Sequence, residues 1–262
     1  MKVYWKIKHV LFEAKKSTSY LLNAVFSTAF GEEKCLICSN PVCGKPLCPQ
    51  CSKELKNLAC MQNERCCICG RSLVSEEKIC NQCRTEPLLK HCDSCSPLFS
   101  YRLWNKSILF DWKMCNERSL SPYFSSLLFS ALTRKFPVNS SIPVIVPVPP
   151  RKGKIHSKGW DQIQELCEYL KWRYGLKIFS CLERVSTVQQ KKLDRKERLD
   201  TVGKNFILGK EFYKAEKKGK LPESVILLDD IITTGATVES CAGLLKKSGI
   251  LNVHVVSIFI VD

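Results

Sequence analysis

The segment that most constrains the fold is a run near the carboxyl end of the chain, residues 225–237. Four apolar residues, Val225–Leu228, lead directly into two adjacent carboxylates, Asp229 and Asp230, and a short loop of threonines around Gly235 comes next. An apolar stretch without alternation is typical of a strand that is buried on both faces of a parallel sheet. The run therefore predicts a buried strand that leads into a polar loop.

The residues after this run supply the rest of a βαβ unit. Glu239–Lys247 has the composition of a crossover helix, which we expect to end at Ser248–Gly249. Residues 253–261 are again apolar and predict the next strand. Open α/β sheets bind their ligands at the carboxyl ends of the strands, so the polar loop lies where a ligand site is expected.

The chemistry of the loop suits a sugar phosphate. The carboxylates of Asp229 and Asp230 can accept hydrogen bonds from two neighbouring ribose hydroxyls. Backbone N–H groups and hydroxyls of the loop can surround a phosphate, and the positive end of a helix beginning near Thr237 points toward the same anion. Each part also has a structural explanation, since Asp often ends a strand and Thr-Gly often caps a helix. The predicted binding residues are Asp229, Asp230, Thr233, Thr234, Gly235, Ala236 and Thr237.

Length and charge limit the classes to which the chain can belong. At 262 residues it can hold one sizeable α/β domain and a small accessory module. The formal net charge is +16, and two zinc sites of four cysteinates each would lower it to about +12. A phosphate-rich ligand, a nucleic-acid surface, a solvated lysine surface and a lysine-rich genome each account for such a charge. No apolar run is long enough to span a membrane, so we expect a cytoplasmic protein.

An amphipathic segment, residues 1–34, opens the chain. Residues 1–16 mix apolar side chains such as Trp5 and Phe12 with several lysines, and residues 20–30 are more apolar. A secretory signal would need a cleaner apolar core and a small-residue cleavage site. The pattern favours a helix that packs on the module behind it, with peripheral contact to a membrane surface as the alternative.

Cysteine is concentrated in one part of the chain. Of the 17 cysteines, 13 lie between Cys35 and Cys95. A Cys-x-x-Cys pair lets two thiolates approach one metal from a tight turn, and two pairs complete a tetrahedron around Zn²⁺. Five pairs can be identified: Cys35/Cys38, Cys48/Cys51, Cys66/Cys69, Cys80/Cys83 and Cys92/Cys95, with Cys43, Cys60 and Cys67 outside them.

We interpret these cysteines as structural zinc ligands in a module that covers residues 35–96. Disulfides would need an oxidising compartment, which nothing in the chain indicates, and four thiolates would also suit an iron–sulfur cluster. The simplest assignment takes the first two pairs as one site and the next two as another, while a cross-braced arrangement is equally compatible with the spacing. Cys92/Cys95 is a spare pair that could replace any other. The predicted ligands are Cys35, Cys38, Cys48, Cys51, Cys66, Cys69, Cys80 and Cys83.

A second candidate anion site lies earlier in the chain, after the cysteine-rich segment. Residues 99–103 predict a strand followed by helices, and the β-branched residues 142–148 predict a central strand that prolines end. The loop 151–159 is basic and contains glycine, and it opens onto a helix expected over 160–172. A cationic loop between strand and helix suits pyrophosphate, whereas the structural alternative is a solvent loop. The candidate residues are Lys152, Lys158 and Gly159.

The segment 182–206 is rich in charged residues and lacks apolar periodicity at its start. This composition favours a mobile loop that closes over an anionic ligand. The loop contains Arg184, Gln190 and Arg198, and the family resemblance given below implies that these three are candidate catalytic residues.

Residues 225–237 resemble the phosphoribosyl-pyrophosphate (PRPP) motif of type I phosphoribosyltransferases. In that family the two acidic residues hold the ribose 2′- and 3′-hydroxyls, and the loop after them holds the 5′-phosphate. The resemblance therefore implies the first role for Asp229 and Asp230 and the second role for residues 233–237.

Further motifs narrow this resemblance. Residues 35–262, with their cysteine pairs before the PRPP motif, are similar to the ComF/GntX family of competence-associated phosphoribosyltransferase-like proteins. The intervening motifs that carry this similarity are Val146–Pro149, Lys158–Gln162 and the pattern Arg184, Thr187, Gln190, Leu193, Arg198 and Phe206, and Lys113 matches a further basic position.

The chain departs from the family pattern in the basic loop. The family usually has Arg-Gly-Phe-Asn-Gln where this chain has Lys158–Gln162. Lysine keeps the charge of arginine but loses its bidentate fork, and Asp161 adds a negative charge near the proposed pyrophosphate site. Thr201 replaces an asparagine that is common a few residues after Arg198. These changes affect the expectation of transfer more than that of PRPP binding.

The resemblance implies an α/β fold: a type I phosphoribosyltransferase-like parallel sheet flanked by helices over residues 97–262, preceded by the small Cys-rich zinc module. It implies that PRPP binds with Mg²⁺ and that pyrophosphate is the leaving group, and the acceptor is not identified by any residue. From the family come a role in DNA uptake or processing and two expected partners, single-stranded DNA and a competence helicase. The alternative is a zinc-ribbon interaction factor on a catalytically silent phosphoribosyltransferase scaffold.

Overall fold

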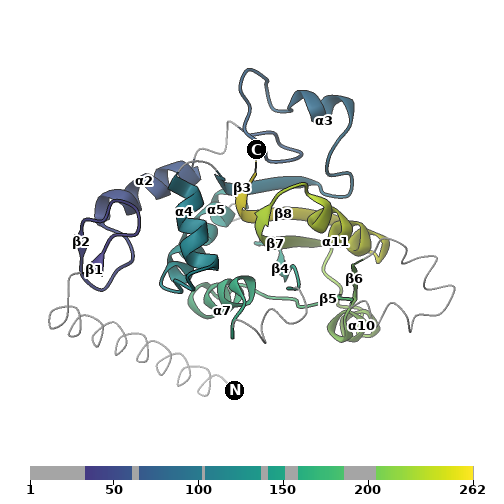
Figure 1. Ribbon diagram of the computed structural model, residues 1–262. Helices are drawn as coiled ribbons and strands as arrows, with labels where there is room; N and C mark the ends of the chain where they lie inside the picture. The colour runs from purple at the N-terminus through teal and green to yellow at the C-terminus, as the bar shows by residue number, and fades with distance from the viewer. Residues whose placement is uncertain are drawn as a thin grey trace, which may run out of the picture. The chain divides into compact units, whose positions relative to one another are not determined.

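The computed structural model describes residues 33–60, 65–101, 104–136, 141–150, 159–185 and 205–261 (Figure 1). The chain divides into two compact units. The described part of the first unit is residues 33–57 and 104–120, and the remaining described residues form the second unit. The expected helix within residues 1–34 lies almost entirely outside the described residues, so it stays a prediction.

The second unit is built on a four-stranded sheet with the order β3-β8-β7-β4, in which every pairing is parallel (Figure 1). Its strands are β3 (Ser94–Ser100), β4 (Val144–Pro147), β7 (Ser224–Ile232) and β8 (Asn252–Ile260). Val225–Leu228 in β7 are at most 1% exposed, as expected for a central strand covered on both faces. The α/β fold with a parallel sheet is therefore confirmed.

Helices cover both faces of this sheet. Helix α11 (Ala236–Lys247) contacts β7 and β8 and shares a core with them that includes Val238, Leu227 and Val255. Helices α5 (Leu120–Lys135) and α7 (Gln162–Tyr174) lie side by side, because Phe129 stacks on Tyr174 with ring centroids 4.1 Å apart. The connection from β3 to β4 crosses the sheet in one direction, and the connection from β7 to β8 crosses it in the other. Because such crossovers are right-handed, α5 lies on the face opposite α11. Helix α7, which stacks on α5, lies on the same face as α5.

The element boundaries differ from those expected at a few places. Strand β7 continues through the acid pair to Ile232, and α11 begins at Ala236, three residues before the expected start. Strand β3 begins at Ser94 instead of near Phe99, because its first residues alternate serine with cysteine and so lack an apolar run. The sheet thus begins within the cysteine-rich segment, and the expected division at residues 96 and 97 stays a prediction.

The ends of the expected closing loop form a small sheet. Strand β5 (Leu182–Arg184) pairs in antiparallel fashion with β6 (Phe206–Leu208), and α10 (Lys210–Lys217) follows. Residues 186–204 between these strands lie outside the described residues.

Part of the cysteine-rich segment is attached to the edge strand β3. Residues 65–72 form a hairpin closed by a bridge between Arg65 and Ser72, and α3 (Asn81–Thr85) follows. The N–H of Cys95 donates to the carbonyl of Cys67 at 3.4 Å, and Ser72 Oγ lies 3.1 Å from Ser100 Oγ. The hairpin therefore supplies hydrogen-bond partners to an edge that would otherwise be open.

The first unit contains a two-stranded sheet and two helices. Strand β1 (Glu33–Lys34) pairs with β2 (Pro41–Val42) in antiparallel fashion. Helix α2 (Pro49–Cys60) begins in this unit and runs into the second, and α4 (Trp104–Lys113) buries Trp112 completely. Within the described part of the chain, no helix is both long and apolar enough to cross a membrane.

Candidate functional site

The acid pair lies in the last part of β7, at the carboxyl edge of the sheet. Asp230 is 8% exposed and Asp229 is half-buried. The carboxylate of Asp229 accepts a hydrogen bond of 2.8 Å from the N–H of Asp230, which fixes one of its oxygens against the backbone. Both aspartates are therefore held in place beside the loop that follows.

The loop between β7 and α11 turns at Gly235, which has two separate reasons to be glycine. Its φ of +80° is unfavourable for any residue with a side chain. In addition, a Cβ at this position would lie only 2.8 Å from Cδ2 of Leu89. The carbonyl of Gly235 then accepts the first helical hydrogen bond from Glu239, at 2.9 Å. This geometry directs the amino end of α11 toward the loop.

An anion is favoured at this helix start. The first N–H groups of a helix have no acceptor within it, and the helix dipole adds a partial positive charge there. The hydroxyl of Thr234 accepts from the N–H of Ala236 at 3.4 Å, which leaves its proton directed away from the helix. The loop thus combines backbone donors, a hydroxyl and a helix start, as a phosphate site requires.

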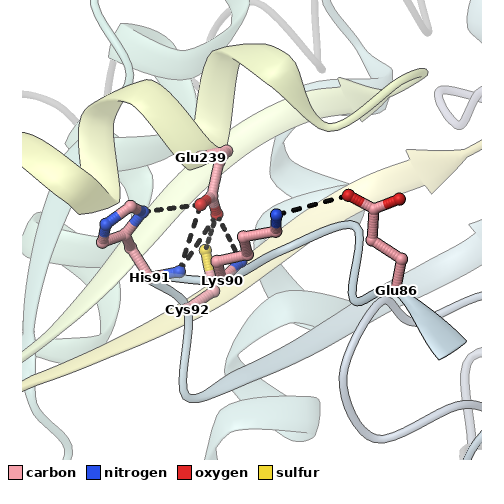
Figure 2. A network of polar contacts seen from close by, with 5 residues as sticks. All are labelled: Glu86, Lys90, His91, Cys92 and Glu239. Atoms are coloured by element: carbon pink, nitrogen blue, oxygen red, sulfur yellow. Dashed lines mark hydrogen bonds and ion pairs between the residues drawn. The ribbon is translucent and has the colours of Figure 1, made fainter. Parts of the chain in front are cut away.

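A carboxylate in the first turn of α11 ties this helix to the cysteine-rich segment (Figure 2). Glu239 accepts from the N–H of Lys90 at 2.9 Å and from the N–H of His91 at 3.2 Å. It also lies 2.6 Å from Nδ1 of His91 and accepts a longer contact of 3.8 Å from the Cys92 thiol. The segment that leads into β3 is thus fastened to the helix that would hold a phosphate.

Cys92 and Cys95, which we interpreted as a spare metal pair, lie outside both groups of four cysteines. Cys92 contacts Glu239, and Cys95 is buried in β3 among the core residues under α11. Burial, assisted by the charge of Glu239, raises the pKa of the Cys92 thiol, and burial raises that of Cys95 to about 12. Both thiols are therefore kept protonated. Glu239 lies almost 150 residues from its partners, at a separation of 147 to 149, so no local pattern could have revealed this contact.

Arg71 is a further residue that the sequence did not single out. It lies in the hairpin of residues 65–72, and it lines a small cavity together with Thr233, Thr234 and Gly235. Its guanidinium donates to the side chain of Gln82 at 3.4 Å, which uses one of its five N–H groups. A cation thus lies beside the candidate phosphate loop, supplied by the cysteine-rich hairpin.

The structure describes only part of the other predicted anion-binding residues. Gly159 has a φ of +73°, in keeping with a tight turn before α7, whereas Lys152 and Lys158 lie outside the described residues. Asp161 is the N-cap of α7 and accepts from the N–H of Gln164 at 3.0 Å. Since Asp and Asn cap helices about equally well, this role accounts for the aspartate.

Of the closing-loop residues only Arg184 is described, and Gln190 and Arg198 lie outside the described residues. Arg184 ends β5, with its guanidinium carbon 5.1 Å from the ring centroid of Phe206. Burial and the charge of Asp229 raise the pKa of the Cys241 thiol in α11, and the charge of Arg184 opposes them. The charges of Arg184 and Asp229 therefore act in opposite directions on the same thiol.

Two groups of four thiols form the candidate metal centres. Cys35, Cys38, Cys48 and Cys51 gather in the first unit, and Cys66, Cys69, Cys80 and Cys83 gather in the second. In each group the four sulfur atoms lie within 4.8 Å of one another. The pairs are grouped in sequential order, and not in the cross-braced order that the spacing also allowed.

The geometry of both groups fits a tetrahedral zinc ion. A Zn–S bond of about 2.3 Å in a tetrahedron separates the sulfurs by about 3.8 Å. Cys38 Sγ lies 3.7 Å from Cys48 Sγ, and Cys69 Sγ lies 3.8 Å from Cys80 Sγ. The eight predicted ligands are thus placed as two Cys₄ clusters compatible with structural zinc.

The ionisation of the thiols also favours a cation. Burial alone would raise the pKa of Cys35, but N–H groups of Cys38, Cys48 and Ile37 together lower it to about 6. Cys66 behaves in the same way, with a pKa of about 7. Burial and the neighbouring sulfurs raise the pKa of Cys51, so the thiols of one cluster do not all ionise without a cation to share.

Comparison with known proteins agrees with this architecture. No family model matches the chain. Competence protein ComFC of Streptococcus pneumoniae is 25% identical over 232 residues, which cover 81% of this chain and 97% of that protein. ComFC of Bacillus subtilis is 24% identical over 78% of this chain and 79% of its own length, and competence protein F of Haemophilus influenzae is 27% identical over 80% and 88%. These similarities, at 24–27% identity over about 80% of the chain, support an assignment to the ComF family of competence proteins.

Proposed function

We propose that the chain binds PRPP, together with Mg²⁺, at the carboxyl end of β7 and acts as a phosphoribosyltransferase-family protein in DNA uptake or processing. The observation that carries this proposal is the acid pair near the end of β7, followed within five residues by a glycine turn into the start of the 12-residue helix α11. The pair supplies acceptors for two hydroxyls and the helix start supplies donors for one phosphate. A ribose 5-phosphate carries both kinds of group.

The proposed roles follow from the charge that a transfer would develop. As the anomeric C–O bond breaks, the ribose ring becomes positive and the departing pyrophosphate becomes more negative. Asp229 and Asp230 would hold the ribose. Lys152, Lys158 and Gly159 would bind the pyrophosphate, and Arg184 would belong to the base of a loop that closes with Gln190 and Arg198.

The donor set also fits Mg²⁺. This ion prefers oxygen ligands and usually binds through one or two carboxylates together with substrate phosphates. Asp229 and Asp230 are the carboxylates at this edge of the sheet. When bound, Mg²⁺ would neutralise part of the charge of the pyrophosphate group.

We further propose that each of the two Cys₄ clusters holds a structural zinc ion. The sulfur separations support this, and a closed site of four cysteines leaves no position for substrate. Elemental analysis should give about two zinc ions per folded chain, and folded protein without zinc would refute the assignment.

A role in DNA uptake is supported by the names of the three relatives, which are competence proteins. The net charge of +16 is consistent with contact to single-stranded DNA. Such binding should weaken steeply as salt is raised, and no retention of single-stranded DNA at low salt would count against it.

Calorimetric titration of Mg²⁺-PRPP tests the proposed site. We expect Asp229→Asn combined with Asp230→Asn to weaken binding by at least about a hundredfold, because two charge-assisted hydrogen-bond pairs to the ribose are lost. Asp93→Asn, a matched change at a carboxylate that pairs with Lys246 at 2.7 Å outside the site, should leave the affinity intact. Equal affinity in the wild type and the double variant would refute this site.

A further inference from the structure

A second cavity in the second unit lies on the opposite face of the sheet from α11. Its volume is about 520 Å³, within the usual range for a small-molecule site. Val256 of β8 lines it, whereas the neighbouring Val255 packs under α11. Because consecutive strand residues point to opposite faces, this cavity is separate from the loop that α11 follows.

The polar lining of this cavity is cationic. It contains the side chains of Arg65, Arg134 and Lys135 and the hydroxyls of Ser94 and Ser96, and Cys66, Cys67 and Cys95 also line it. Ala131, Leu132 and Val256 form its apolar part. Among the described residues, no carboxylate lies within 4.0 Å of Lys135 or Arg134. Asp93, an acid of the same region, is already paired with Lys246 at 2.7 Å.

Lys135 is the centre of this group. It lies partly buried in the last turn of α5, and its ammonium donates to Ser94 Oγ and to Ser96 Oγ, each at 2.6 Å. Two of its three protons are therefore used, and the third is available to a ligand. Burial lowers the pKa of Lys135, so a negatively charged ligand would stabilise the ammonium form.

The hydroxyls extend the donor set. Ser94 Oγ lies 2.9 Å from Nδ1 of His254, and burial lowers the pKa of that imidazole, so its neutral form accepts the Ser94 proton. Ser96 accepts from Lys135 and keeps its own proton for another acceptor. Arg134 uses one N–H on the carbonyl of Ala59, at 3.3 Å. The contacts among the described residues thus leave one ammonium proton, one hydroxyl and most of one guanidinium for a ligand.

We propose that this cavity binds the phosphate group of a small phosphorylated molecule of about nucleotide size. Lys135 and Arg134, which have no carboxylate partner among the described residues, favour an anionic ligand, and the ammonium, guanidinium and hydroxyl donors that line the cavity suit the oxygens of a phosphate. The apolar residues on the other side of the cavity leave room for a ring or a short chain. This site is independent of the proposed PRPP site, and either can fail alone.

Amide chemical shifts locate such binding directly. Inorganic phosphate and adenosine 5′-monophosphate, each titrated to about 10 mM, are the two probes, since weak anion sites have millimolar dissociation constants. We expect saturable shifts at the amides of Ser94 and Ser96, in addition to any at Thr234 and Gly235. A larger affinity for the nucleotide than for phosphate would indicate that the apolar residues of the cavity contact the base or the ribose.

Variants decide the assignment. Lys135→Met, which keeps the apolar part of the side chain, should lower the affinity measured from the shifts of Ser94 and Ser96 by at least tenfold. Lys135→Arg, which keeps the charge, should retain this affinity. Lys214→Met removes an equal charge from an exposed pair on α10 and should change nothing. If Lys135→Met unfolds the chain, Ser96→Ala provides the same test through the hydroxyl. Shifts confined to Thr234 and Gly235, or unaltered by these variants, would overturn the proposal.

Discussion

The two cysteine clusters have the same ligand set but different surroundings. In the first cluster Cys38 is exposed, and the other three thiols are buried within a unit of short strands and turns. In the second cluster all four cysteines are buried, and Ile68, Leu73, Ile79 and Leu88 pack around them. Leu89, next to Leu88, reaches Gly235. The second cluster therefore supports the candidate phosphate loop, whereas the first supports its own unit.

This difference shows that two cysteine clusters with the same ligands can differ in how closely they are connected to the candidate phosphate loop. The second cluster contributes three contacts to the loop and α11: the side chain of Leu89, the guanidinium of Arg71 and the partners of Glu239. All of them belong to the second unit. We therefore expect damage to the second cluster to reach the PRPP site and damage to the first to remain local.

The largest effect should come from removing a pair of cysteines in the second cluster. Cys66→Ser with Cys69→Ser should lose one zinc ion and unfold the cysteine-rich residues 65–88 while the sheet stays folded, because zinc supplies about 10 kcal/mol or more in small Cys-rich modules. Cys35→Ser with Cys38→Ser is the matched variant. It should lose the same amount of zinc but keep the affinity for PRPP. Zinc content by elemental analysis and PRPP affinity by calorimetry distinguish the two, and an equal loss of affinity in both would break the comparison.

A smaller but severe effect is expected at the glycine that contacts Leu89. Gly235→Ala should weaken PRPP binding by at least about tenfold, because the backbone strain of about 1–2 kcal/mol adds to a clash with Leu89. Gly219→Ala is the control: its φ is also positive, at +59°, but nothing lies within 4 Å of the added Cβ. Similar stability losses without a difference in PRPP affinity would show that the loop does not need this approach.

The contacts of Glu239 should contribute an intermediate effect. Glu239→Gln keeps the shape of the side chain but replaces charge-assisted hydrogen bonds by neutral ones, at a cost of about 1–2 kcal/mol. We expect thermal unfolding at a lower temperature and PRPP affinity reduced by about tenfold. Glu211→Gln removes a carboxylate from an exposed pair with Lys214 and should have little effect on either. An unchanged PRPP affinity in Glu239→Gln would mean that residues 89–92 and the loop are uncoupled.

The smallest effect is expected from Arg71, the cation that the hairpin of residues 65–72 supplies beside the loop. Arg71→Met should reduce PRPP affinity by about threefold to tenfold, since a partly solvated charge contributes about 1 kcal/mol. Lys45→Met, beside the first cluster, is the matched loss of charge. The dependence of the affinity on salt should flatten only in Arg71→Met, and the same slope in both variants would remove Arg71 from the site.

The sequence was sufficient for the local parts of this molecule. The buried apolar strands, the acid pair before a glycine turn and the two sets of cysteines each depend on residues close together in the chain. It was insufficient where distant segments meet. Glu239 with His91, Leu89 with Gly235 and Lys135 with Ser94 are side-chain contacts across the fold. The start of β3 was missed for another reason, since its alternating serines and cysteines were assigned to metal binding alone.

Hydrogen exchange in the candidate phosphate loop tests most directly whether the second cluster, and not the first, supports this loop. The exchange rates of residues 233–239 are compared with those of residues 253–260 in β8, which report unfolding of the whole unit. The comparison is made in two double variants, Cys66→Ser with Cys69→Ser and Cys35→Ser with Cys38→Ser. The account predicts that loss of the second cluster accelerates exchange in the loop by at least about tenfold more than in β8, and that loss of the first changes neither. Loop exchange that is unchanged on loss of the second cluster, or equally accelerated by loss of either, would contradict it.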